Sequence, residues 1–224
     1  EYLGEAANSM AGYPFAQLQF SYLYEADEHV NWKLLQEAQL EGWHVPFLHK
    51  NTLARTAATV GEPFRHAAIK CFGPHSMVAS NAPANYEPTP VASLSMKYGQ
   101  GSYDAFASEQ VSKEGEMNWH GAFDLYHIFP NFFIGLLQGS FFTYNIWPLA
   151  YDRTIWEVRL YYPCALNAGE LFSLEYGKCG LRDTLREDAY AHEKIQQVVG
   201  SQAKKVFHLQ EEETAVRNFN RAVS

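Results

Sequence analysis

Two histidines, His44 and His49, stand five positions apart in the segment Glu41-Gly-Trp-His-Val-Pro-Phe-Leu-His. On an unbroken α-helix, five positions correspond to roughly 140° of rotation in excess of one turn, which is too wide for one face. Pro46 lies between them and breaks such a helix, because proline lacks an amide donor and restricts the residue before it. The break allows both rings to converge, and neutral imidazoles bind iron, copper, zinc or nickel. Spacing alone leaves one alternative, two unrelated histidines beside a turn.

A metal site built on two histidines needs a third protein ligand, and a late helical segment supplies acidic residues. These are Asp183, Glu187, Asp188 and Glu193. Asp188 lies near the apolar stripe that Leu185 and Ala189 form, one turn from His192. The acids also alternate with basic residues, so a solvent-exposed charged face is the alternative for each of them.

The other candidate sites in the sequence are weaker. His66, Cys71 and His75 have a spacing that suits a metal, but glycine and proline interrupt the segment and a fourth soft ligand is missing. His120 and His127 flank an expected strand, which favours structural roles. The sequence contains no G-x-S-x-G, P-loop or G-x-G-x-x-G motif, so acyl transfer and nucleotide binding have no support.

Composition narrows the class of protein. The 224 residues are 47% hydrophobic and 19% charged, which is typical of one folded domain. A net charge of -8 argues against a nucleic-acid partner, and no apolar run reaches the roughly 20 residues of a membrane span. The cysteines Cys71, Cys164 and Cys179 are odd in number and widely spaced, which favours a reducing, cytoplasmic location.

The elements that must position the candidate ligands follow from the hydrophobic pattern. We expect strands over 17–24, 123–135, 139–147 and 154–162, with a further strand at 93–98. We expect helices over 31–42, 181–199 and 211–223, a turn over 148–153 and a long surface loop over 72–92. Gly200 is expected to follow the end of the long helix. The pattern predicts an α+β fold, an antiparallel sheet with a late helix packed against it.

Three segments, in this order, resemble a known family. Asn31-Trp-Lys-Leu-Leu-Gln-Glu, followed by Glu41-Gly-Trp-His and His49, is similar to the segment that opens the iron site of Rieske-type ring-hydroxylating oxygenase alpha subunits. Ile128-Phe-Pro-Asn131 and the strands after it resemble the family's core hairpins. Arg186-Glu-Asp188 resembles the helix that donates the carboxylate ligand.

The resemblance implies a helix-grip domain (START/Bet v 1-like), in which an antiparallel sheet wraps around a long C-terminal helix. It implies a mononuclear Fe(II) held by His44, His49 and Asp188, with open positions for O2 and substrate. Glu41 matches the carboxylate that bridges an iron ligand to the Rieske cluster of a neighbouring subunit, and so serves electron transfer. Asn131 is a candidate contact to substrate, with a role in a turn as the alternative.

The largest departure from the family is a missing motif. The sequence has no C-x-H…C-x-x-H motif, so the cysteines that would hold a [2Fe–2S] cluster are absent from these residues. The chain begins with Glu1 rather than methionine. We therefore interpret residues 1–224 as a single catalytic domain, a fragment of a longer chain whose N-terminal [2Fe–2S] domain lies outside it.

The function that the resemblance implies is hydroxylation of an apolar, aromatic or polycyclic substrate with Fe(II) and O2. The implied partners are a ferredoxin or reductase as electron donor and further copies in a homotrimer, with or without beta subunits; neither nucleic acid nor membrane is expected. One alternative is a metal-free helix-grip module that binds a hydrophobic ligand, because the aromatic content suits that equally well. Another is a zinc hydrolase.

Overall fold

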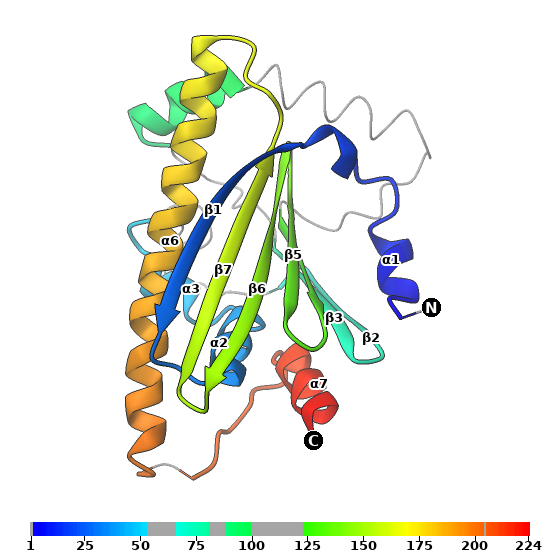
Figure 1. The fold of residues 1–224 in the computed structure, drawn as a ribbon, viewed down its shortest axis with the longest axis vertical. Helices are drawn as coiled ribbons and strands as arrows, with labels where there is room; N and C mark the ends of the chain where they lie inside the picture. The colour runs from blue at the N-terminus through cyan, green and yellow to red at the C-terminus, as the bar shows by residue number, and fades with distance from the viewer. Residues whose placement is uncertain (1, 53–65, 81–87, 100–122, 204) are drawn as a thin grey trace.

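The computed structural model describes residues 2–52, 66–80, 88–99, 123–203 and 205–224. Within them, one antiparallel sheet has the strand order β1-β7-β6-β5-β4-β3-β2 (Figure 1). The strands are β1 (Phe20–Glu28), β2 (Ala68–Phe72), β3 (His75–Ser80), β4 (Phe123–Ile128), β5 (Phe132–Leu137), β6 (Ser140–Ala150) and β7 (Arg153–Tyr162). The labelled helices are α1 (Glu5–Ser9), α2 (Trp32–Gln39), α3 (Val45–Leu48), α6 (Ala168–Gly200) and α7 (Thr214–Val223).

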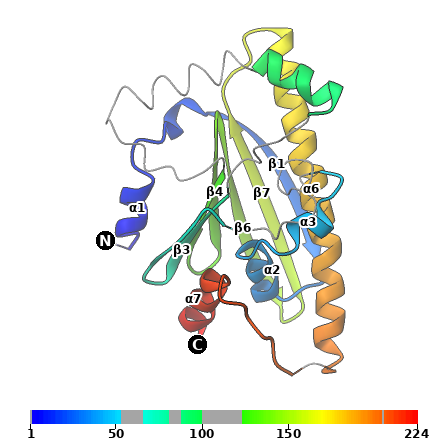
Figure 2. The ribbon, with the colours of Figure 1, turned by 180° about the vertical axis from the view of Figure 1, so that it is seen from behind.

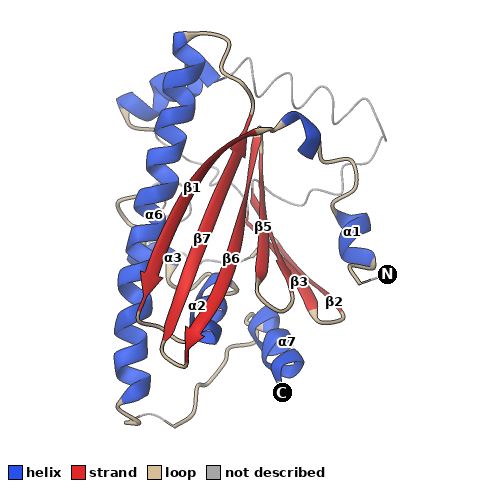
Figure 3. Cartoon of the chain, viewed as in Figure 1, coloured by secondary structure: helices blue, strands red, loops and turns tan. Residues whose placement is uncertain are grey.

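The predicted fold class is confirmed. The described residues are built around a seven-stranded antiparallel sheet and the long helix α6 (Figure 3). The 33-residue helix α6 is about 50 Å long at 1.5 Å per residue and runs beside the edge strand β1. Seen from behind, α2 and α3 lie between α6 and the middle of the sheet (Figure 2).

The sheet separates two hydrophobic clusters. Its inner face packs Tyr144, Trp156 and Val158 against Leu35 of α2 and Leu185 of α6. The alternation of side chains along each strand places these three strand residues on one face, because Tyr144 pairs with Val158 and Ile146 pairs with Trp156. The outer face packs against the N-terminal segment, through Ala6, Met10 and Leu18. The face that carries α2, α3 and α6 is therefore the one that positions the candidate ligands.

The long helix begins 13 residues before the expected start at 181. Asn167 caps it: its side-chain oxygen accepts from the Glu170 amide at 2.9 Å, and its side-chain amide donates to Glu170 Oε1 at 2.9 Å. The expectation for Gly200 was also wrong, because this glycine is the last helical residue and Ser201 is the C-cap.

Several strand boundaries differ from the prediction. Residues 123–135 form two strands rather than one, because Pro130 lies in the turn between β4 and β5. The expected loop at 72–92 contains strand β3, which pairs with β4. The expected strand at 93–98 is part of a helix over 90–99, where Thr89 Oγ1 accepts from the Ala92 amide at 3.2 Å. Strand β6 continues to Ala150 through a bulge near Pro148, which shortens the expected turn over 148–153.

The strands at 17–24, 139–147 and 154–162 and the helices at 31–42 and 211–223 are confirmed as β1, β6, β7, α2 and α7, with shifted ends. The three cysteines, Cys71, Cys164 and Cys179, are exposed and form no disulfide. None of the helices in the described ranges combines the length and the apolar character that crossing a membrane requires.

Candidate metal centre

A single helical turn brings His44 and His49 together. His44 is the N-cap of α3 and His49 is its C-cap. Two backbone hydrogen bonds close the turn, from the Leu48 amide to the His44 carbonyl at 2.7 Å and from the His49 amide to the Val45 carbonyl at 3.1 Å. Pro46 is tolerated because it lies in the first turn, where its missing donor has no helical partner. The two ring centroids are 5.1 Å apart, so the predicted convergence of the pair is confirmed.

Helix α6 supplies the acid that faces both rings. The Oδ1 atom of Asp188 lies 3.0 Å from Nε2 of His49 and 3.6 Å from Nε2 of His44. Asp188 and His49 are buried, and His44 is partly buried. One ligand atom from each of the three residues lies within 4.8 Å of the other two, and this is the one such cluster found in the described ranges.

The far nitrogen of each ring is held by a second carboxylate. His44 Nδ1 donates to Glu41 Oε1, while the other oxygen of Glu41 accepts from the amides of Trp43 and His44. His49 Nδ1 donates to Glu187 Oε2 at 2.9 Å. Hydrogen bonds of this kind fix the ring orientation and leave Nε2 as the free nitrogen. Both Nε2 atoms consequently point at the same oxygen of Asp188.

The charges around His49 change its protonation. Burial alone would lower the pKa of His49, but the carboxylates of Asp188 and Glu187 outweigh that effect and raise its pKa above the usual value. Because Glu187 and Asp188 each lie against one ring nitrogen of His49, a positive charge located between the two carboxylates is stabilised. Either a proton or a metal cation can supply that charge.

The donor set fits a mononuclear metal ion. Two ligand atoms bound at about 2.1 Å and at right angles to each other are about 3 Å apart, close to the separations found between Asp188 and the two histidines. Two imidazoles and one carboxylate on one side of an ion leave its other positions open, an arrangement typical of non-haem Fe(II) oxygenases.

A family model for the ring-hydroxylating alpha subunit (catalytic domain) matches residues 15–224. This chain belongs to the ring-hydroxylating alpha-subunit family. A search of curated proteins found no match.

Solved structures of oxygenases share the fold of this ring-hydroxylating domain. Naphthalene 1,2-dioxygenase from Rhodococcus sp. aligns over 99% of the chain, with a TM-score of 0.67 and 18% identity, and 60% of that protein is covered. A quaternary ammonium Rieske monooxygenase aligns over 98% of the chain, with a TM-score of 0.67 and 12% identity, and 54% of it is covered. The chain thus spans about half the length of the structures that it matches.

The structure assigns the remaining predicted site residues to other contacts. Asn131 lies in the turn between β4 and β5, and its side-chain amide donates to the Ile146 carbonyl at 2.7 Å; a contact to substrate stays a prediction. Asp183 forms an ion pair with Arg182, and Glu193 accepts from the His29 amide, so neither joins the histidine pair.

The weaker histidine candidates have no place in the ligand cluster. Both ring nitrogens of His75 are bonded to backbone, to the Tyr2 carbonyl at 2.9 Å and to the Phe129 amide at 3.1 Å, so the His66–Cys71–His75 site is not formed. His127 has the structural role that was expected, since its Nε2 bonds to Gln36 Oε1 at 2.9 Å. His120 lies outside the described residues.

Proposed function

We propose that His44, His49 and Asp188 bind a mononuclear Fe(II) ion and that the domain hydroxylates an organic substrate with O2. One observation carries this proposal. The Nε2 atoms of His44 and His49 both face the same buried oxygen of Asp188, while both Nδ1 atoms are already hydrogen-bonded to other carboxylates. Membership of the ring-hydroxylating family supports iron over zinc. When bound, Fe(II) supplies the activation of O2.

The chain's own residues would prepare the site for that chemistry. The hydrogen bonds that the two imidazoles donate to Glu41 and to Glu187 hold the rings before any metal arrives, so little conformational freedom is lost on binding. Burial of Asp188 and of His49 restricts the access of water to the ion. We propose that Glu41, whose carboxylate accepts from His44 Nδ1, also lies on the route by which electrons arrive.

The electrons must come from outside these residues. Each turnover consumes one O2, two electrons and two protons, and ends either with both oxygen atoms in the substrate or with one in the substrate and one in water. We propose that a Rieske [2Fe–2S] domain supplies the electrons, itself reduced by a ferredoxin or reductase, in an oligomer such as a homotrimer.

We propose an apolar, aromatic substrate, because aromatic side chains lie on the inner face of the sheet beside the acid. Tyr144 packs edge-on against Trp156, with ring centroids 5.1 Å apart. Burial raises the pKa of Tyr144 well above its usual value, and the negative charge of Asp188 adds to this shift. Tyr144 is therefore close enough to Asp188 to interact with it electrostatically. The aromatic surface that Tyr144 and Trp156 form suits a planar apolar molecule.

Iron binding tests the proposal directly. Purified protein loaded anaerobically with Fe(II) is expected to retain about one iron per chain. The variants His44→Ala, His49→Ala and Asp188→Ala should lose it, whereas His208→Ala, which removes an exposed histidine, should not. Retention that is unchanged in all three ligand variants would refute the site and favour a metal-free binding module.

Turnover distinguishes iron chemistry from hydrolysis. Hydrogen peroxide supplies both oxygen and the two electrons, so the iron-loaded domain plus peroxide should hydroxylate naphthalene without an electron donor. Tight binding of zinc, with no hydroxylated product from the iron form, would instead point to a hydrolase.

A further inference from the structure

We propose that Glu187 is the positioning residue that sets the orientation of His49 for metal binding, an inference that rests on the iron site proposed above. The family resemblance assigns no role to this residue. Its carboxylate is one of a pair, because Glu187 and Asp188 are consecutive on α6 and both contact the same ring. Glu187 Oε2 accepts from Nδ1 at 2.9 Å, and Asp188 Oδ1 lies 3.0 Å from Nε2.

This arrangement places the imidazole of His49 between two adjacent carboxylates of one helix. Consecutive residues of an α-helix point about 100° apart, so their two carboxylates approach the ring from different sides. A rotation of the ring that kept one contact would break the other. The orientation of His49, and with it the direction of its metal-facing nitrogen, is thereby fixed relative to Asp188.

A second donor holds the carboxylate of Glu187 itself. Thr52 Oγ1 donates to the same Oε2 atom at 2.6 Å, so this oxygen accepts from a ring nitrogen and from a hydroxyl. Thr52 follows the C-cap of α3 by three residues, and its amide donates to the His49 carbonyl at 3.1 Å. The contact from Thr52 therefore makes the position of Glu187 depend on α3 as well as on α6.

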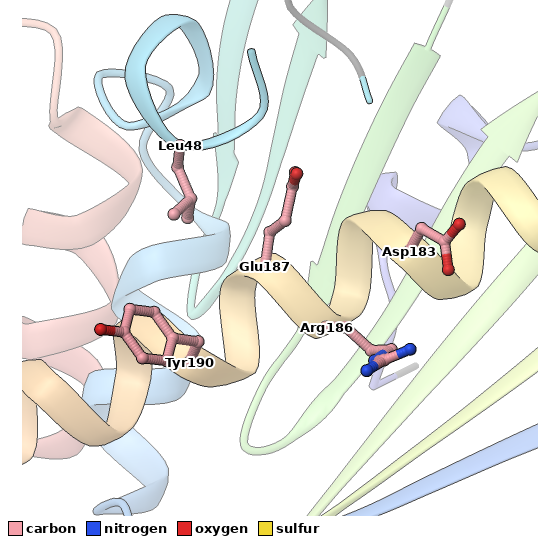
Figure 4. Close-up of a pocket in the computed structure, with 5 residues that line it drawn as sticks. All are labelled: Leu48, Asp183, Arg186, Glu187 and Tyr190. Atoms are coloured by element: carbon pink, nitrogen blue, oxygen red, sulfur yellow. The ribbon is translucent and has the colours of Figure 1, made fainter. Parts of the chain in front are cut away.

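Glu187 differs from Asp188 in its access to solvent. Its side chain is 23% exposed, against 7% for Asp188. It lines a surface hollow of about 500 Å³ together with Leu48, Asp183, Arg186 and Tyr190. Figure 4 shows Glu187 extending from α6 toward the segment that carries Leu48. Because Glu187 both lines the hollow and accepts from Nδ1 of His49, Glu187→Ala would vacate the space that its carboxylate occupies between them.

That vacated space allows a test by chemical rescue. Glu187→Ala should bind Fe(II) or Co(II) about 10- to 100-fold more weakly than the wild type, the usual effect of losing such a bond. Sodium formate should restore part of the affinity in this variant and leave the wild type unchanged. Glu187→Gln keeps an acceptor at the same place and should lose less than Glu187→Ala. The matched control is Asp183→Ala, one turn away in the same hollow, which should bind metal like the wild type.

A spectroscopic signal separates positioning from a general effect on folding. In the Zn(II)-loaded wild type, the Nδ1 proton of His49 should give a low-field, slowly exchanging proton resonance, and Glu187→Ala should lose it. If Glu187→Ala does not fold, Thr52→Val removes the second donor and should weaken metal binding several-fold. Wild-type affinity in the Glu187 variants, with the resonance intact, would overturn this inference alone. Failure of the wild type to bind metal would overturn the proposed function instead.

Discussion

The buried pair formed by Glu28 and His192 allows the loss of stability on removal of one partner to be predicted. His192 Nδ1 donates to Glu28 Oε2 at 2.9 Å, and the two residues are only 2% and 3% exposed. Among the described residues, the other carboxylate oxygen of Glu28 has no hydrogen-bond partner. His192→Leu would therefore leave a buried carboxyl group without any partner. The substitution removes the polar contact and keeps an apolar side chain in contact with Trp156.

The size of the effect follows from burial. Removing one partner of a buried pair costs about 3–5 kcal/mol, because the remaining group stays desolvated without compensation. For a domain of this length, 1 kcal/mol corresponds to about 2–4 °C, so the melting temperature should fall by about 6–20 °C. The double variant Glu28→Leu, His192→Leu removes both polar groups, and should recover at least half of the lost free energy.

Urea unfolding of the metal-free proteins, followed by tryptophan fluorescence in the presence of a chelator, measures these differences without a contribution from metal binding. A single variant within 1 kcal/mol of the wild type would refute the reasoning. A double variant as unstable as His192→Leu would also refute it, because it would show that the loss comes from packing rather than from the unpaired acid.

Three further outcomes are expected. Gly135→Ala should destabilise the domain by about 1–3 kcal/mol in urea unfolding, because the added Cβ would lie 2.2 Å from the Phe142 ring. Gly177→Ala lies on an exposed turn of α6, where the added Cβ would meet nothing within 4 Å apart from its chain neighbours and the helix backbone, and it should instead stabilise the domain by about 0.5–1 kcal/mol. Burial lowers the pKa of His127 to about 4. The unfolded chain therefore binds a proton below about pH 6.5 that the folded chain rejects, and stability should fall by up to about 3 kcal/mol as the pH drops from about 6.5 to 4, a slope that His127→Gln should lack.

The three proposed metal ligands could be selected from the sequence because the family resemblance added to a local signal at each. His44 and His49 flank a proline, and Asp188 lies beside an apolar helical stripe. The role of Glu187 had no such signal. Its neighbour in sequence already serves as the expected ligand, and a helix normally turns consecutive residues toward different surroundings. Only the placement of α3 beside α6 shows that one imidazole can contact both.

The first 13 residues of α6 were missed for a related reason. Within this part of the helix the one buried side chain belongs to Lys178, an ionisable residue. A search for apolar periodicity therefore underestimates the buried face of this helix. The cap formed by Asn167 and Glu170 was the signal that would have placed the helix start correctly.

The long separation in sequence between α3 and α6 has a consequence for protein synthesis. His49 and Glu187 are 138 positions apart. At about 5–20 residues per second, a ribosome makes the second about 7–28 seconds after the first. During that interval the nascent chain has His49 without the carboxylates of Glu187 and Asp188 that contact its ring. Under the proposed assignment, metal binding therefore has to wait until α6 has been synthesised, and a chain released before Asp188 would lack the carboxylate needed to retain the ion.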